Sequence, residues 1–293
     1  MPKFRKNFTD NHLEALKAVW RLVNATAQAI AYSQNMPKSR DYWRAYLNDM
    51  RDEGWLTAKQ IFTTARTGKN GRNLGTLYAL TKEGAAIIAE TLGIEIEDVF
   101  YPRAGIYASS PFQFPHRAEF IELLAVFLGH QKKSEGRFEV LDLMPYYRHE
   151  GSNRLGTGHA ATRVQVIGDF KTGALVPDAL MRFRVGDTVR LTAIEFHRET
   201  DTRGIIEQLR KHAAAIERGA FTAMYDHRAA NHVLSIHANA DKLRNVRERI
   251  ASGEFPDFER YASGYHFTTV ADLFERGLED AFFTLKREKT AIF

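Results

Sequence analysis

The segment Val176 to Thr202 constrains the fold of this chain more than any other stretch. Apolar and polar residues alternate along 179–185 and again along 189–196, on either side of the dipeptide Gly186-Asp187. Alternation on both sides of a two-residue turn that contains glycine is typical of a β-hairpin. The sequence therefore predicts two paired strands joined by a tight turn.

Two carboxylates lie at the ends of these predicted strands. Asp178 follows Pro177 at the start of the first strand, and Glu195 lies near the end of the second. A twisted hairpin with unequal arms can bring both to the same end of a sheet. Two oxygen ligands that face one cavity suit Mg²⁺ or Mn²⁺ with open positions for a phosphate and a water. The pair thus indicates a metal-dependent nuclease; the alternative is two solvent-exposed charges at strand ends.

The composition is that of a folded protein without disulfides. Of the 293 residues, 44% are hydrophobic and 12% aromatic, which suffices for one large domain or two ordinary ones. The absence of cysteine from the sequence excludes thiolate metal sites and favours a reducing compartment. No apolar run approaches membrane-spanning length and no secretory signal pattern occurs, so we expect a cytoplasmic protein without a membrane segment.

The net charge of +5 is unevenly distributed. Residues 1–92 contain 14 Lys and Arg against 8 Asp and Glu, whereas the remaining 201 residues contain 27 against 28. All of the positive excess therefore lies in the first third. This distribution is typical of a DNA-binding unit followed by a near-neutral domain. The alternative is a basic face that is simply solvated.

The first third has the element order of a winged helix. Apolar residues at helical spacing predict helices over 11–23 and 25–32, and Ser39 is a favourable N-cap for a third helix that ends near residue 53. Two strands follow, and a further helix spans 82–92. Three short helices, two strands and a closing helix predict a winged helix-turn-helix domain.

Basic residues mark the expected DNA contacts of this domain. Candidate contacts to base edges or phosphates lie on the outer face of the third helix: Arg40, Arg44, Asn48 and Arg51. Candidate contacts to the DNA backbone lie between the two strands: Arg66, Lys69 and Arg72. The stretch 57–82 contains five basic residues and no acidic one, which favours DNA over a protein as the partner.

The rest of the chain predicts a second, α/β domain, with the boundary near residue 100 and domains of residues 1–100 and 101–293. Strands are expected at 138–143, in the hairpin, and at 232–238 and 265–268. Helices are expected at 115–128, 204–218, 241–250 and 270–286. This order predicts a three-layer α/β core with a mixed central sheet. The segment 149–162, rich in Gly, Ser, Asn and Arg, is expected to form a loop beside the carboxylate pair.

Several other classes of site lack their sequence patterns. The chain has no Walker loop, no dinucleotide-binding glycine pattern after a strand and no serine-hydrolase elbow. The closely spaced histidine pair of tyrosine relaxases is also missing from the sequence. We expect His212, His232 and His237 to be packing or surface residues rather than ligands.

Five blocks resemble, in order and spacing, the replication-relaxation family of mobile elements: VPDALMRF, AIEFHRETDT, IIEQLRKHAAAIERGAF, HVLSIHANADKLRNVRERI and FTTVADLF. That family joins an N-terminal winged helix to a PD-(D/E)XK restriction-endonuclease-like domain. It includes the C-class mobilisation relaxases, which nick plasmid DNA at the transfer origin. The resemblance covers most of residues 10–287.

The resemblance implies a role for five residues. Asp178 and Glu195 match the two metal carboxylates of the family, and Glu119 matches the acid that such nucleases place on the first helix. His197 stands where the family more often shows aspartate and restriction enzymes show lysine, so it could ligate the metal or act on the attacking water. Lys211 could supply a cation for the charge that builds on the phosphate.

The function implied by the resemblance is that of a relaxase or nicking endonuclease of a plasmid or other mobile element. It would cut one DNA strand at a transfer or replication origin, with Mg²⁺ or Mn²⁺ as cofactor. The expected partners are double-stranded DNA at the origin, single-stranded DNA after nicking, and accessory transfer or replication proteins. A tyrosine nucleophile, Tyr146 or Tyr147, is a less favoured route. The alternative function is a non-catalytic winged-helix DNA-binding regulator with an inert nuclease-like domain.

Overall fold

The structure is a computed structural model, and it describes residues 8–35, 38–62, 73–103, 114–150, 159–165, 174–198, 201–225, 232–285 and 288. Contacts divide the chain into two compact units, residues 1–134 and 135–293. The fold belongs to the mixed α/β class, as the sequence predicts. Within the described ranges, no helix has the length and apolar character needed to cross a membrane.

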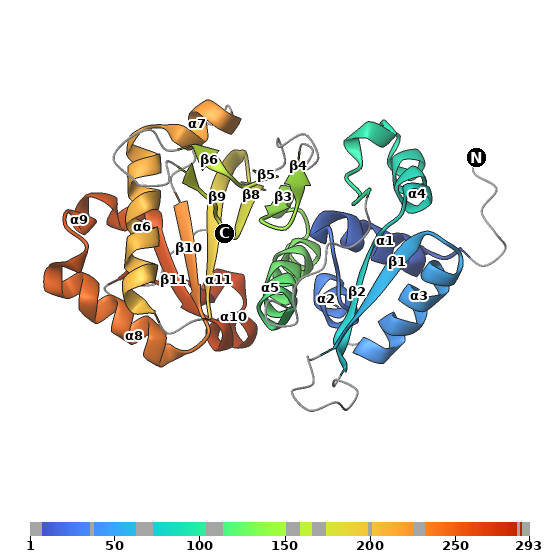
Figure 1. Cartoon of the computed structure of the whole chain (residues 1–293), viewed down its shortest axis with the longest axis horizontal. Coiled ribbons are helices and arrows are strands. Elements are labelled where there is room, and N and C mark those ends of the chain that lie inside the picture. Colours follow the sequence, from blue (N-terminus) through green and yellow to red (C-terminus); the bar gives the residue numbers. More distant parts are fainter. Residues whose placement is uncertain are drawn as a thin grey trace. The chain divides into compact units, whose positions relative to one another are not determined.

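The first unit combines helices with a β-hairpin (Figure 1). Its elements are α1 (Asp10–Leu22), α2 (Ala27–Ser33), α3 (Arg40–Asp52), β1 (Leu56–Phe62), β2 (Asn73–Leu80), α4 (Lys82–Leu92), the short 3-10 helix η1 (Ile96–Asp98) and α5 (Phe114–Lys133). Thr26, Ser39 and Thr81 begin α2, α3 and α4, because each side chain accepts a hydrogen bond from a backbone N–H in the first turn. Ala25 also pairs with Tyr78 through two backbone hydrogen bonds of 2.9 Å, which adds a short third strand segment beside β2.

Helix α5 packs closely against α2 because Gly129 has no side chain. A Cβ atom at this position would lie 2.2 Å from the backbone oxygen of Tyr32, a distance that no side chain tolerates. The compact unit therefore extends to residue 134 and includes α5. This division differs from the sequence analysis, which places the boundary near residue 100, before this helix. Helical periodicity alone carries no signal for such a backbone-to-backbone contact.

The second unit is built on a mixed sheet of five strands in the order β11-β10-β9-β8-β3. The strands are β3 (Phe138–Pro145), β8 (Ala179–Val185), β9 (Thr188–His197), β10 (His232–His237) and β11 (Tyr265–Thr269). Strands β3, β8 and β9 pair antiparallel, whereas β9, β10 and β11 pair parallel. The mixed sheet and the hairpin of β8 and β9 confirm the prediction, and Gly186 makes the turn with a φ of +54°.

Helices and two short strand pairs complete the second unit. The helical elements are α6 (Thr202–Glu217), α7 (Ala220–Tyr225), α8 (Ala240–Arg249), η3 (Ile250–Glu254), α9 (Phe258–Tyr261), η4 (Ala262–Gly264), α10 (Val270–Arg276) and α11 (Leu278–Ala281). The pairs are β4 (His149–Glu150) with β5 (His159–Ala160), and β6 (Val164–Gln165) with β7 (Ala174–Leu175). A single helix over 270–286 is wrong, because Gly277 adopts a φ of +74° and separates α10 from α11.

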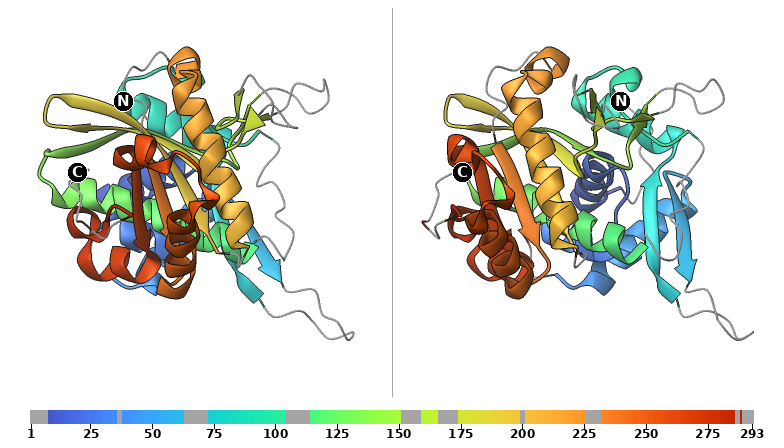
Figure 2. Two further views of the ribbon diagram at one scale, coloured as in Figure 1. Left: turned by 90° about the vertical axis from the view of Figure 1, so that its left-hand side faces the viewer. Right: turned by 60° about the vertical axis from the view of Figure 1, so that its left-hand side comes forward.

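Helices α6 and α8 cover the sheet face that carries Glu195. Figure 2 shows α6 lying across the strands. Ile205 and Leu209 of α6 join Val246 of α8 in one buried cluster with Val233 and Phe267 of the strands. The parallel register pairs Ser235 with both Glu195 and Phe267, so the side chain of Glu195 lies on this helix-covered face. The core of the unit therefore surrounds the predicted metal ligand.

Candidate functional site

The first candidate site is a polar cleft in the first unit. Its volume is about 850 Å³, and one wall is the face of α3 formed by Arg40, Arg44, Asn48 and Arg51. Thr26 at the start of α2, Gln60 and Thr76 of the hairpin, and Phe114, Ala118 and Glu122 of α5 also line it. The four candidate residues of α3 are thus brought together on one surface.

The geometry of α3 explains why these side chains share a surface. Trp43, Leu47 and Met50 are fully buried, which fixes the helix by its apolar stripe and turns the arginine face away from the core. Arg44 Nη1 lies 3.0 Å from Asp41 on the preceding turn, and about half of the Arg44 side chain is exposed. The arginine face is therefore ordered but open to a ligand.

Two further contacts shape the basic face. The hydroxyl of Tyr78 on β2 donates a hydrogen bond of 3.0 Å to Asn48 Oδ1, which fixes the orientation of this amide. Arg51 Nη2 lies 2.7 Å from Asp52. The predicted backbone contacts Arg66, Lys69 and Arg72 lie outside the described residues.

The second candidate site lies in the second unit, where β8 begins and β9 ends. The register pairs Ala179 with Ile194, which places Asp178 opposite Glu195. Asp178 Oδ2 accepts a hydrogen bond of 2.8 Å from the N–H of Phe196. In return, the backbone N–H of Asp178 donates to the carboxyl group of Glu195. The structure therefore places the two predicted residues, Asp178 and Glu195, opposite each other on paired segments.

Glu195 is fully buried and hydrogen-bonded to α6. Gln208 Nε2 donates to Glu195 Oε2 at 2.6 Å, and His212 Nε2 contacts Glu195 Oε1. Complete burial raises the pKa of Glu195 to about 8, although hydrogen bonds from Gln208 and the Asp178 backbone act in the opposite direction. Burial also lowers the pKa of His212 to about 3. Both shifts favour the uncharged forms, a protonated carboxyl group of Glu195 beside a neutral imidazole of His212.

Sequence reasoning gives Gln208 no role and expects His212 to be a packing or surface residue, so neither is predicted to be a partner of Glu195. Gln208 and His212 are four residues apart, so both lie on the same side of α6. They interrupt the apolar stripe that includes Ile205 and Leu209. Polar residues at inward positions of an amphipathic helix are a sequence signal for a buried polar partner. Sequence alone does not identify Glu195 as that partner.

His197 lies two residues beyond Glu195 in a cluster of its own. Its ring is 4.9 Å from the ring of His237, and Ser235 Oγ lies 2.9 Å from His237 Nε2. Burial lowers the pKa of His237 well below its usual range, and His197, Arg247 and Lys242 act in the same direction. His237 is thus a neutral imidazole in a basic environment.

Lys211 and Glu119 are the other two predicted site residues. Lys211 Nζ pairs with Glu207 at 3.3 Å on the partly exposed side of α6, since adjacent helical residues point about 100° apart. Glu119 is exposed on α5 and belongs to the first unit.

The groups around Glu195 differ from the ligands that Mg²⁺ or Mn²⁺ needs. Hard divalent cations need ionised oxygen ligands with free lone pairs. Both oxygens of Glu195 are already engaged by Gln208 and His212, and burial raises its pKa, which favours the protonated form. Among the residues that the structure describes, no three His, Asp or Glu side chains form a group that could hold a metal ion. In this arrangement the residues do not fit a divalent cation.

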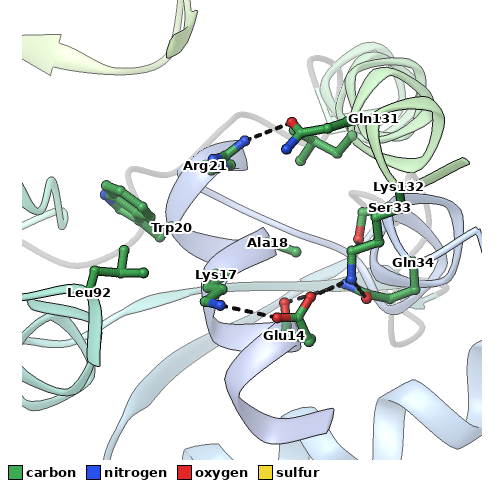
Figure 3. A pocket seen from close by; sticks show the side chains of 11 residues that line it. Glu14, Lys17, Ala18, Trp20, Arg21, Ser33, Gln34, Leu92, Gln131 and Lys132 are labelled. Atoms are coloured by element: carbon green, nitrogen blue, oxygen red, sulfur yellow. Dashed lines mark hydrogen bonds and ion pairs between the residues drawn. The ribbon is translucent and has the colours of Figure 1, made fainter. Parts of the chain in front are cut away.

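A smaller pocket of about 220 Å³ lies between α1, α2, α4 and α5 (Figure 3). Lys132 of α5 donates to both Glu14 of α1 and Gln34 at the end of α2. Lys17 adds a contact of 3.2 Å to Glu14. Figure 3 shows these side chains converging on the carboxylate. The charges of this pocket are satisfied internally, and the network holds α5 against α1 and α2.

Comparisons with protein-family models, curated proteins and solved structures found no match to this chain. The features that bear on its function are the two candidate sites and the sequence blocks. The cleft in the first unit presents ordered cations to a ligand. Of the two carboxylates in the second unit, Glu195 is fully buried and its pKa is raised, whereas Asp178 is partly exposed.

Proposed function

We propose that this chain is a DNA-binding protein of the winged-helix type that acts at a replication or transfer origin of a mobile element. Its support is the row of Arg40, Arg44, Asn48 and Arg51 along the open face of α3. The order α1, α2, α3, β1, β2 and α4, with Ala25 paired to Tyr78, suits this type of domain. That the DNA target is a replication or transfer origin is inferred from the sequence resemblance alone.

The chemistry of α3 fits the major groove of duplex DNA. Arginine can donate two hydrogen bonds to guanine O6 and N7, and asparagine can bond the edge of adenine. Arginine side chains also neutralise phosphates, which makes affinity dependent on salt. Helix α3 is held by its buried stripe, so binding would not require the helix itself to fold.

Replacement of Arg44 by alanine tests this function. The expected result is about a tenfold loss of affinity for a duplex of about 30 base pairs, since one guanidinium contact to a base or phosphate is removed. Fluorescence anisotropy with labelled duplex measures it. Arg244→Ala is a matched control, because Arg244 pairs with Asp241 three residues earlier on α8 just as Arg44 pairs with Asp41. Unchanged affinity of Arg44→Ala would contradict the proposal.

A second function, cleavage of one DNA strand, is favoured by one observation. Asp178 and Glu195 are adjacent at the end of the β8–β9 hairpin, as a nuclease of the PD-(D/E)XK type would require. The order β3, β8, β9, α6 and β10 is compatible with such a domain. Against it stands the protonated, hydrogen-bonded state of Glu195. The binding function therefore has the stronger support.

A nicking assay separates the two functions. The cleavage function predicts open-circular product when the whole chain is incubated with supercoiled origin plasmid and Mg²⁺ or Mn²⁺. The product should be lost in Asp178→Ala and retained in Asp187→Ala, a control at the exposed turn of the same hairpin. Product that survives Asp178→Ala would exclude this site. No product from the unmodified chain, with binding intact, would leave the DNA-binding function alone.

A further inference from the structure

An acidic side chain lines the arginine cleft of the first unit. Glu122 of α5 lines the same cleft as Arg40, Arg44 and Arg51 of α3. Carboxylates repel phosphates and are depleted from surfaces that only neutralise the DNA backbone. A carboxylate in this position therefore needs a different explanation from the arginines.

The position of Glu122 is fixed by its neighbours. Thr26 Oγ1 donates to Glu122 Oε1 at 3.2 Å, and Thr26 itself caps α2 by accepting from the N–H of Ala29 at 3.0 Å. Helix α5 is held in turn by the close contact of Gly129 with Tyr32. Among the described residues, no other side chain donates to Glu122, so its second oxygen is available to a ligand in the cleft.

Among the residues that the structure describes, no cation forms an ion pair with Glu122. Burial raises the pKa of Glu122 and Glu119 acts in the same direction, whereas Thr26 and Arg40 act in the opposite direction. The arginines of α3 pair with acids of their own helix, Arg44 with Asp41 and Arg51 with Asp52. Glu122 is therefore a hydrogen-bond acceptor in a cleft whose other charged groups are mainly donors.

We propose that Glu122 is a specificity-determining residue of the DNA-binding site, an inference that rests on the proposed function. Its carboxylate disfavours backbone phosphate in the cleft, which weakens binding to unrelated sequences. It accepts a hydrogen bond from the exocyclic amine of cytosine or adenine, which are the base groups that donate in the major groove. The arginines provide the affinity for DNA, and Glu122 restricts the DNA sequences that are bound tightly.

Glu122→Gln tests this role, because glutamine has the same shape and can still accept from Thr26. Two readouts are needed: anisotropy with a mixed-sequence duplex, and selection of bound sequences from a random duplex library. We expect the variant to bind the mixed-sequence duplex about fivefold more tightly and to lose about tenfold of the preference for cytosine or adenine at one position. Glu90→Gln, an exposed acid on α4, is the control and should change neither readout.

The outcomes distinguish this inference from the function on which it rests. If Arg44→Ala weakens binding but Glu122→Gln leaves both readouts within twofold of the unmodified chain, the role of Glu122 is overturned and the DNA-binding function stands. Weaker binding by Glu122→Gln also overturns it. If Arg44→Ala binds normally, the DNA-binding function fails and the role of Glu122 fails with it. Tighter, less selective binding by Glu122→Gln and by Glu122→Ala supports the proposal.

Discussion

Replacement of Glu195 by alanine is expected to lower the free energy of unfolding of the second unit by about 3–5 kcal/mol. The substitution leaves His212 and Gln208 without their buried partner and opens a cavity between β9 and α6. Glu195→Gln is the matched variant, because its amide can donate to His212 and its oxygen can accept from Gln208. We expect that variant to stay within about 1 kcal/mol of the unmodified chain.

The three tryptophans make this experiment specific to one unit. Trp20, Trp43 and Trp55 all lie in the first unit, so tryptophan fluorescence reports the unfolding of that unit alone. Far-ultraviolet circular dichroism reports both units. In a denaturant titration, Glu195→Ala should shift the circular dichroism transition and leave the fluorescence transition unchanged. A shift below about 1 kcal/mol would show that the buried network contributes little.

Because of the buried contact between Glu195 and His212, we expect the second unit to lose stability as the pH rises from about 6.5 to about 8. The folded state keeps a proton on Glu195 up to about pH 8, whereas the unfolded chain releases it near 4.5, so higher pH favours unfolding. Below about 6.5, protonation of His212 in the unfolded chain opposes this trend, because its folded pKa is about 3. When the folded state binds one proton more than the unfolded chain, each rise of one pH unit lowers the free energy of unfolding by about 1.4 kcal/mol.

We therefore expect a loss of about 1–2 kcal/mol between pH 6.5 and 8, measured by denaturant titration with circular dichroism. The loss should disappear in Glu195→Gln, which has no proton to release. Stability that stays constant over this interval in the unmodified chain would mean that Glu195 is ionised in the folded state. In that case the objection to a metal ion at Asp178 and Glu195 would be removed.

Local sequence signals predict much of this fold. The alternation around Gly186 gives both strands of the hairpin to within one residue at each end of β8 and β9. The N-cap Ser39 and the apolar stripe of Trp43, Leu47 and Met50 give α3 and its basic face. These features depend on neighbours within a few turns of the chain, and such short-range patterns are what sequence reasoning can use.

The environment of Glu195 depends on contacts between distant parts of the sequence, which the periodicity of apolar residues does not reveal. Gln208 and His212 reach Glu195 from the following helix, and the separation in sequence conceals the pairing. The spacing therefore predicts that the two acids are neighbours but cannot predict that burial raises the pKa of Glu195. The extent of the first unit is similarly decided by Gly129 against the backbone of Tyr32, a contact without a local pattern.

The short pairing of Phe283 with Phe267 has a consequence for association between molecules. Strand β11 ends the order of the five-stranded sheet, and its outer side would otherwise present open backbone groups. Phe283 forms two backbone hydrogen bonds with Phe267, of 2.9 and 3.0 Å, along that side. An edge strand whose backbone groups are unpaired can pair with strands of other chains, which leads to aggregation. Because Phe283 pairs with Phe267 along this edge, the chain itself covers part of the edge strand and so disfavours fibril formation through it.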